Sequence, residues 1–147
     1  MYLYLGGKMV GLPGLGFGEF DMAATTLRKR GHTVFNPADH DRQCGFNPDE
    51  DYLGTYVDID KSGFSRKAAL RADFDWIFST SQGMVALENW PSSPGTRFEI
   101  AAHQSIFLPV WELGDFLAFG TSAPVLLPLL YGGKGKPNEQ GNLLVVP

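Results

Sequence analysis

The residues best suited to chemistry lie between positions 92 and 99, in the sequence Ser-Ser-Pro-Gly-Thr-Arg-Phe-Glu. A serine followed by a proline is typical of a helix start, with Ser93 as the cap. The first amides of a helix lie at its positive end, so those of Gly95 and Thr96 are suited to a phosphate or similar anion. Glu99 follows about one turn later, where a carboxylate can act as a nucleophile at the anomeric carbon of a sugar. This segment therefore predicts a sugar-phosphate site.

A second acid, Asp73, precedes Glu99 by 26 positions and falls on the apolar stripe of another predicted helix. Burying an unpaired carboxylate is costly, so Asp73 either faces a polar cleft or pairs with a cation such as Arg71 or Arg97. An acid in a cleft is a candidate for proton transfer. The alternative for the helix start at Ser93 is purely structural, because a cap followed by an acid within two turns is ordinary capping.

Other polar residues show weaker patterns. The histidines lack the spacing of a metal site, although His40, flanked by Asp39 and Asp41, leaves a cation site and a solvated loop as alternatives. The acids between residues 49 and 60 lack the central glycine of a calcium loop. A Gly6-Gly7 pair after a strand lacks the full dinucleotide fingerprint. We therefore expect no metal and no cofactor.

Composition narrows the class of protein. A chain of 147 residues with 44% hydrophobic and 13% aromatic residues predicts one globular domain. The formal net charge of -4 favours a small-molecule ligand over nucleic acid. A single cysteine, Cys44, excludes an internal disulfide and favours a reducing, cytoplasmic compartment. The first residues lack a signal-peptide pattern, and no apolar run approaches the roughly 20 residues of a membrane helix, so we expect no membrane partner.

Strand-like and helix-like segments alternate along the chain. We predict strands at residues 2–5, 32–35, 83–87 and 106–111, and helices at 18–30, at 65–79 and from 93 onward. This order predicts an α/β fold, a flavodoxin- or Rossmann-like three-layer sandwich with a mostly parallel central sheet. The predicted domain spans residues 1–119, with a polar excursion at 38–64. Residues 120–147 form an unassigned C-terminal extension, for which an added strand, an oligomer contact and partial disorder are alternatives.

In an open parallel sheet, ligands bind at the carboxyl ends of the strands. Three segments are expected to meet there: the turn at residues 6–8, the loop at 88–90 and the helix start at 93–96. We therefore predict that the substrate is bound by Gly6, Gly7, Lys8, Asn89, Trp90, Ser93, Gly95 and Thr96.

Residues 2–111 carry several motifs that resemble, in the same order, the nucleoside 2-deoxyribosyltransferase-like superfamily. The most specific resembles the family's Gly-Thr-x-Phe-Glu and reads here Gly95-Thr96-Arg97-Phe98-Glu99. The first strand is similar too, with a tyrosine before the glycine turn in Tyr4-Leu5-Gly6-Gly7. The spacing between Asp73 and Glu99 agrees as well. The chain resembles most closely a small, mostly phage-encoded branch of the family. The segments that carry this closer resemblance are Gly11-Leu12-Pro13, Leu27, Gly31-His32, Asn36-Pro37-Ala38-Asp39-His40-Asp41, Arg71-Ala72-Asp73, Trp76-Ile77 and Val85-Ala86-Leu87 before Trp90.

The resemblance implies a role for each matching residue. Glu99 would be the nucleophile that attacks C1′ and forms a glycosyl-enzyme intermediate. Asp73 would orient the sugar or handle the proton of the base, and Tyr4 would hold the nucleophile in place. Where the transferases carry an aspartate that binds the 5′-hydroxyl, this chain has Ser93. A neutral donor there resembles the nucleoside 5′-monophosphate N-glycosidases, because an aspartate would repel a phosphate.

These features predict an enzyme that cleaves the N-glycosidic bond of a (deoxy)nucleoside 5′-monophosphate, giving free base and sugar phosphate. The resemblance also implies a homodimer or higher homo-oligomer, located in the host cytoplasm if the protein is phage-encoded. Three alternatives stay open: a base-exchanging deoxyribosyltransferase, a non-catalytic protein that sequesters a nucleotide, and a phosphoribohydrolase of the lysine-decarboxylase-like group. The last is disfavoured because Ser92 and Ser93 replace the glycine pair of that group's motif.

Overall fold

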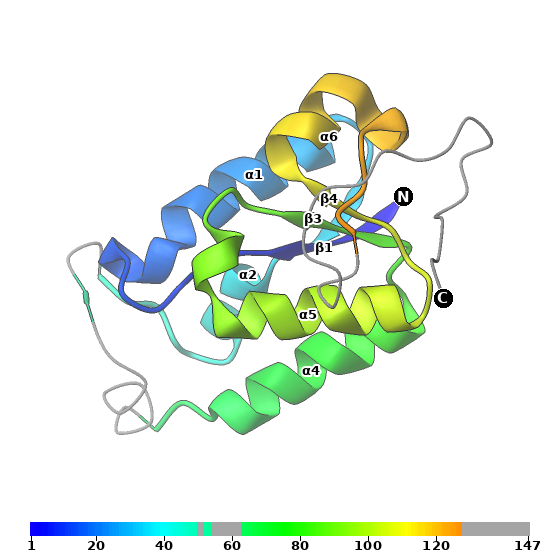
Figure 1. The fold of residues 1–147 in the computed structure, drawn as a ribbon. Coiled ribbons are helices and arrows are strands. Elements are labelled where there is room, and N and C mark those ends of the chain that lie inside the picture. The colour runs from blue at the N-terminus through cyan, green and yellow to red at the C-terminus, as the bar shows by residue number, and fades with distance from the viewer. Residues whose placement is uncertain (50–51, 54–62, 128–147) are drawn as a thin grey trace.

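The structure, a computed structural model, describes residues 1–49, 52–53 and 63–127. Its centre is a four-stranded sheet with the order β2-β1-β3-β4, in which all neighbouring strands pair in parallel (Figure 1). The strands are β1 (Tyr2–Gly6), β2 (Thr33–Phe35), β3 (Gly83–Ala86) and β4 (Val110–Glu112). This order is the one found in flavodoxin-like sheets, so the predicted α/β class is confirmed.

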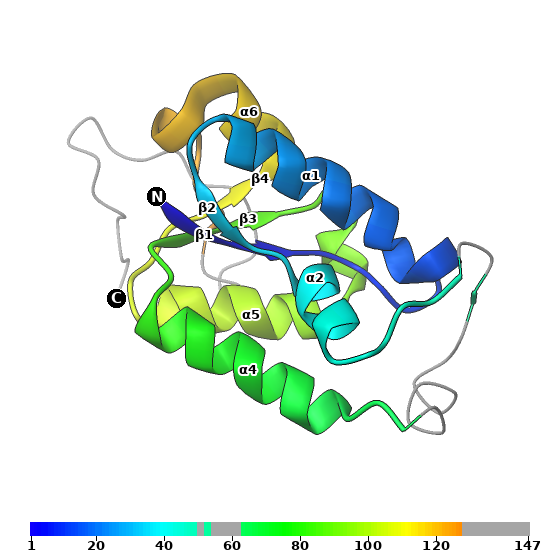
Figure 2. The same cartoon turned by 180° about the vertical axis from the view of Figure 1, so that it is seen from behind.

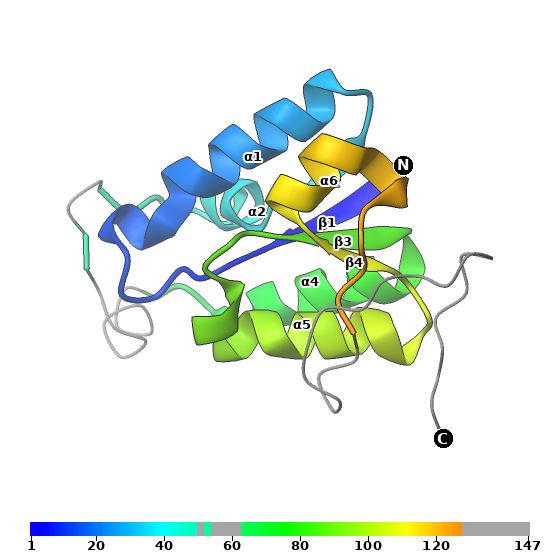
Figure 3. The ribbon, with the colours of Figure 1, turned by 45° about the horizontal axis from the view of Figure 1, so that its top comes forward.

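Helices cover both faces of the sheet and complete the three layers (Figures 1 and 2). One face carries α1 (Phe17–Lys29) and α6 (Leu113–Phe119), which lie above the sheet in Figure 3. The other face carries α4 (Arg66–Ser79) and α5 (Pro94–Ser105). A short helix, α2 (Pro37–Gln43), follows β2. The 3-10 turns are η1 (Pro13–Gly16), η2 (Trp90–Ser92) and η3 (Gly120–Ser122). Over the described residues, no helix combines the length and apolarity needed to span a bilayer.

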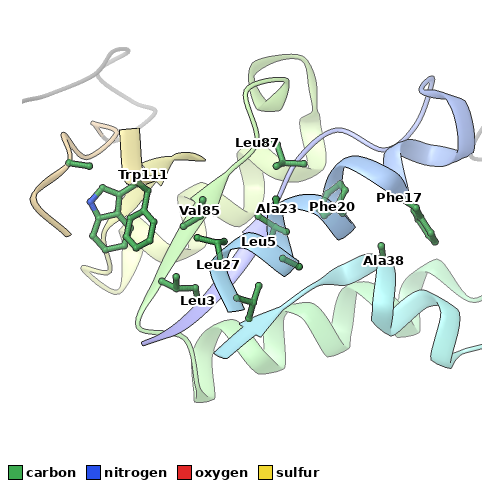
Figure 4. Packing of buried hydrophobic residues seen from close by; sticks show 14 of the residues in the cluster. Leu3, Leu5, Phe17, Phe20, Ala23, Leu27, Ala38, Val85, Leu87 and Trp111 are labelled. Atoms are coloured by element: carbon green, nitrogen blue, oxygen red, sulfur yellow. The ribbon is translucent and has the colours of Figure 1, made fainter. Parts of the chain in front are cut away.

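The alternation of side chains along β1 places its residues in two different cores. Leu3 and Leu5 pack into the cluster beneath α1 and α6, together with Val85 and Trp111 (Figure 4). Tyr4 points the other way and packs into the cluster beneath α4 and α5. The strand therefore delivers a phenol to the face of the sheet that carries α5.

Two helix starts follow from local capping. The Ser65 hydroxyl accepts a hydrogen bond from the Ala68 amide, and the Ser93 hydroxyl accepts one from the Thr96 amide. These side chains replace partners that the first turn of a helix lacks. The predicted starts of α4 and α5 are therefore confirmed.

The polar excursion predicted from residue 38 is wrong for its first part, because α2 forms there. The Asn36 side chain accepts a hydrogen bond from the Ala38 amide, and Pro37 occupies the first turn. Asn36 and Pro37 thus repeat the cap-and-proline pattern that begins α5. Residues 50–51 and 54–62 of the predicted excursion lie outside the described residues.

The strand predicted at residues 106–111 begins later, at Val110. The Leu108 amide donates to the carbonyl of His103, and Phe107 has a φ of 60°. These residues close the C-terminal end of α5 instead of extending, which is a common way to satisfy the last carbonyls of a helix. The apolar run at residues 106–111 does not by itself distinguish the end of a helix from the beginning of a strand.

The first residues of the predicted C-terminal extension pack against the domain. Val125 forms an isolated antiparallel bridge with Trp111, and the Leu126 amide donates to the carbonyl of Val110. Leu126 is buried. Residues 120–127 therefore join the same packed unit as β4, whereas residues 128–147 lie outside the described part of the chain.

Candidate active site

The three segments expected to converge at the carboxyl end of the sheet are joined by hydrogen bonds of 2.8 Å. The Leu87 amide donates to the carbonyl of Gly6, and the Lys8 amide donates to Asn89 Oδ1. The Thr96 hydroxyl donates to the carbonyl of Gly7. The predicted convergence of the glycine turn, the loop after β3 and the start of α5 is therefore confirmed.

A cavity of about 440 Å³ lies where these segments meet. Five of the predicted substrate-binding residues line it: Gly6, Gly7, Ser93, Gly95 and Thr96. The two predicted catalytic acids, Asp73 and Glu99, line it as well. Most of the remaining wall is apolar, although the Arg66 side chain also contributes. A concave, mostly apolar site with a few polar groups is typical of a small-molecule pocket.

Tyr4 and Glu99 form the best-defined contact of this site. The Tyr4 hydroxyl donates to Glu99 Oε1 across 3.0 Å, and both side chains are buried. Burial raises the pKa of Glu99 to about 7, and the hydrogen bond from Tyr4 acts in the opposite direction. Gly6 makes room for this carboxylate, because a Cβ at that position would lie 2.9 Å from Glu99 Oε2.

Asp73, on α4, faces the same cavity without a partner. Only 7% of the residue is exposed, and within the described residues its carboxyl makes no hydrogen bond or ion pair. Arg71, one of its predicted partners, pairs with Asp75 instead. Burial, followed by the negative charges of Glu99 and Asp41, raises the pKa of Asp73 to about 8. Of the two alternatives for this acid, the structure thus supports the one facing a cleft.

The start of α5 differs from the expectation in one respect. The Thr96 amide is not an open anion donor, because it donates to Ser93 Oγ across 3.3 Å. Ser93 Oγ also lies 2.9 Å from the Thr96 hydroxyl. The Gly95 amide makes no hydrogen bond to any described residue, and Gly95 lines the cavity. The positive end of α5 therefore offers one amide to a ligand.

Lys8, Asn89 and Trp90, which were predicted to bind substrate, do not line the cavity. The Asn89 side chain accepts from the Lys8 amide and donates to Glu19 Oε2 across 3.0 Å. Trp90 donates through Nε1 to Glu112 Oε1 across 3.2 Å. These side chains tie the surrounding loops to α1 and β4, so the structure shows them bracing the site.

His103 contacts the backbone of Glu99 and the side chain of Ser81. Its Nδ1 lies 2.8 Å from the carbonyl oxygen of Glu99, which can only accept, so Nδ1 carries the proton. Its Nε2 lies 2.9 Å from the hydroxyl of Ser81. Burial lowers the pKa of His103 to about 4, so the ring is neutral. The histidine ties the middle of α5 to the turn before β3.

Sequence reasoning missed one carboxyl of the cavity. Asp41, interpreted as part of a cation site or a solvated loop, lines the cavity from α2, and 9% of the residue is exposed. The signal for it was the cap and proline at Asn36 and Pro37, which predict a helix with positions 37, 38 and 41 on one face. In the described part of the chain, no group of three or more His, Cys, Asp or Glu side chains is placed to hold a metal ion.

Residues 1–112 match the family described as "Domain of unknown function (DUF4406)". The chain belongs to this family. The matched DUF4406 region ends at Glu112, the last residue of β4, and contains Tyr4, Asp41, Asp73 and Glu99. No curated protein matches the chain. The candidate site therefore lies wholly within the DUF4406 domain.

Proposed function

We propose that this protein cleaves the N-glycosidic bond of a (deoxy)nucleoside 5′-monophosphate, giving free base and sugar phosphate. The observation that carries the proposal is the hydrogen bond from Tyr4 to Glu99 Oε1, inside a cavity that Asp73 also lines. Because the phenol occupies Oε1, Glu99 Oε2 is the oxygen available to a sugar. Glycosidic-bond cleavage typically uses two carboxyl groups, one as the nucleophile and one as the general acid, and this cavity contains both.

The reaction divides into two displacements. In the first, Glu99 Oε2 attacks C1′, and the C1′–N bond breaks with its electron pair moving to the base. The protonated carboxyl of Asp73 supplies a proton to the departing base. In the second, water attacks C1′ and the bond to Glu99 breaks. Asp73 takes the proton released by the water, so both acids return to their starting states.

The charges of the two acids support this division of roles. The pKa of Glu99, about 7, is the lower of the two, in part because the Tyr4 hydrogen bond favours its ionised form. The pKa of Asp73 is raised further, to about 8, by burial and by the negative charge of Glu99. Near neutral pH the pair thus shares one proton, with Asp73 as the acid and Glu99 as the nucleophile.

The start of α5 supports a phosphate on the substrate. The Ser93 oxygen accepts from the Thr96 amide, and with the Thr96 hydroxyl donating to Gly7, the Ser93 hydroxyl donates to Thr96 Oγ1, so this turn carries no acid and Ser93 adds no negative charge. The Gly95 amide lies at the same positive end of the helix. One free amide at a helix start, with no acid in the same turn, suits a 5′-phosphate better than a 5′-hydroxyl alone.

The test is incubation with nucleoside monophosphates and the matching nucleosides, with and without an added acceptor base, followed by chromatography of bases and sugars. We expect base and free sugar phosphate from a monophosphate. Glu99→Gln, which retains a hydrogen-bonding oxygen for Tyr4, should lose about a thousandfold or more of this activity. Asp75→Asn removes an exposed carboxyl from α4 and is the control expected to stay active.

The products separate the alternatives. Sugar recovered on the added base instead of in water would identify a base-exchanging transferase. Binding of a nucleotide with no base release by the unaltered protein would identify a sequestering protein. If Glu99→Gln releases base as fast as the unaltered protein does, Glu99 is not the nucleophile.

A further inference from the structure

A third buried carboxyl, Asp41, faces the cavity and has no role in the chemistry above. It makes no hydrogen bond or ion pair to any residue in the described part of the chain, although more than nine-tenths of the residue is buried. Its charged neighbours on α2 are engaged elsewhere. Arg42 donates to both oxygens of Asp21, at 2.9 and 2.6 Å, and Asp39 accepts from Arg28 at 2.9 Å.

Unpartnered buried carboxyls are costly, so this one is suited to meeting a ligand that supplies donors. Burial raises the pKa of Asp41 to about 6, which leaves the carboxyl mostly ionised at pH 7.5. An ionised carboxyl is an acceptor at both oxygens and a donor at neither. The group that Asp41 meets should therefore present hydrogens toward it.

The cavity that Asp41 lines also carries aromatic side chains. Phe20, Phe46 and Phe64 line the same cavity, and the rings of Phe46 and Phe64 lie with their centroids 4.9 Å apart. Flat apolar rings favour contact with another flat ring. A cavity with aromatic walls and a few polar groups suits a planar ligand, whose orientation the polar groups fix.

The polar groups of the cavity come from different elements, so each element can be assigned to one part of a nucleotide. Ser93 and Gly95 belong to the start of α5, and Glu99 lies one turn further along that helix. Asp41 comes from α2, a different element that packs against α1 and α4. With the phosphate at the start of α5 and the sugar at Glu99, the group left for Asp41 is the base.

We propose that Asp41 reads the base and selects one that presents two adjacent N–H donors, of which guanine is the common example. The inference rests on the proposed function, because it places a nucleotide in this cavity. The N1–H and the 2-amino group of guanine match the two oxygens of a carboxylate in a bidentate pair. Adenine and cytosine place an acceptor beside their amino group, and hypoxanthine and uracil offer a single N–H on that edge.

The first measurement is base release from GMP, IMP, AMP, CMP and UMP and their deoxy forms by the unaltered protein. GMP or dGMP should be cleaved about a hundredfold faster, in kcat/KM, than the corresponding IMP or dIMP. These two bases differ in the 2-amino group alone, and a site built around a buried acceptor discriminates strongly against a ligand that leaves it unpaired. Equal rates for the guanine and hypoxanthine substrates would overturn the inference.

The decisive variant is Asp41→Asn, which replaces one acceptor oxygen by an amide donor. Xanthine carries an N–H beside a carbonyl at the edge where guanine carries two donors. Asp41→Asn should therefore lose most of its activity toward GMP and gain activity toward XMP, a gain that a merely structural residue does not predict. Asp39→Asn, a change in a partly exposed acid on the same helix that does not line the cavity, is the control expected to keep the guanine preference.

Binding separates this inference from the proposed function. Calorimetry with Glu99→Gln and uncleaved GMP, IMP and XMP measures base preference without any catalysis. Tighter binding of GMP than of IMP, with no base release by the unaltered protein, would support base recognition by Asp41 and contradict the proposed activity. Base release without a guanine preference would support the proposed activity and contradict base recognition by Asp41. Loss of GMP binding in Asp41→Asn without a gain for XMP would also overturn it.

Discussion

Tyr4 donates a hydrogen bond to Glu99 across 3.0 Å, although the two residues lie 95 positions apart in the sequence. The contact joins the first strand to the middle of α5 across one face of the sheet. Burial and the charges of Glu99 and Asp73 hold the pKa of Tyr4 well above 10, so the phenol keeps its proton and always donates. The contact thus controls both the position and the charge of Glu99.

Tyr4→Phe should shift the acid limb of the pH-rate profile upward. The phenol lowers the pKa of Glu99, and a hydrogen bond to a charged group contributes about 1.5 to 3 kcal/mol, or roughly one to two pH units. At pH 7 the rate of base release should therefore fall by about fivefold to fiftyfold. Tyr2→Phe, at an exposed position on the same strand, is the control. An unchanged acid limb in Tyr4→Phe would contradict the proposed coupling.

Gly6→Ala should disrupt the site more than the fold. A methyl group there would lie 2.9 Å from Glu99 Oε2 and would overlap the end of the Met84 side chain. Met84 has a flexible end, but Glu99 is held by Tyr4, so the added methyl should displace the carboxylate. We expect at least a hundredfold loss of kcat/KM, since small misplacements of reacting groups are costly. Gly18→Ala, where no atom lies within 4 Å of the new carbon, should leave activity unchanged.

The rate of base release should depend on pH as a bell. The rising limb follows ionisation of Glu99, whose pKa is about 7, and the falling limb follows loss of the proton of Asp73, whose pKa is about 8. Because the two acids interact, these limbs describe the pair. Asp73→Asn should abolish the alkaline limb and slow the reaction, while Asp75→Asn should retain the bell. A flat profile from pH 6 to 9 would contradict the assignment.

The stability of the ligand-free protein should fall as the pH rises from 6.5 to 8. The pKa values of Glu99 and Asp73 are raised from 4.5 and 3.8, so the folded state holds protons that the unfolded state has released. This stabilisation is complete below the unfolded values and is lost as pH rises through the folded ones. Each group contributes a slope of about 1.4 kcal/mol per pH unit at most.

Urea unfolding at pH 6.5, 7.0, 7.5 and 8.0 measures this slope, and Asp73→Asn should reduce it. His103 works in the opposite sense, because its pKa is lowered from 6.5 to about 4. Its stabilisation is present above 6.5 and is lost as pH falls toward 4. Above pH 6.5 the contribution of His103 fades, so the two carboxyls set the sign of the slope there. Stability that rises with pH in that window would contradict their burial as acids.

Ser93→Asp should change the substrate from a nucleotide to a nucleoside. Aspartate is as good a helix cap as serine, so α5 should keep its start, but the added charge repels a phosphate. The ratio of kcat/KM for monophosphate over nucleoside should fall about a hundredfold. Ser93→Asn caps the helix without the charge and is the matched control. An equal fall in both variants would mean that charge at this position is not what selects the phosphate.

Local patterns accounted for much of what the sequence predicted correctly. The caps at Ser65 and Ser93 act within three residues, and the alternation of β1 places Tyr4 opposite Leu3 by geometry alone. The delayed start of β4 could not be seen, because it depends on how α5 ends. Asp41 could not be placed with certainty from the sequence, because the polar residues after the helix signal at Asn36 are equally typical of a loop.

By itself, the sequence determined the order of the four strands and of α1, α4 and α5, the capped start of α5 and the places of Tyr4, Asp73 and Glu99 on β1, α4 and α5. These depend on spacing and on short-range hydrogen bonds. The sequence did not predict α2 or α6. Only the tertiary structure decided that Asp41 shares their cavity and that no cation of the described residues pairs with Asp73. It also decided that Lys8 and its loop neighbours lie outside the cavity. The burial of these side chains, their hydrogen-bond partners and their pKa values depend on residues that are far apart in the sequence, so no local pattern predicts them.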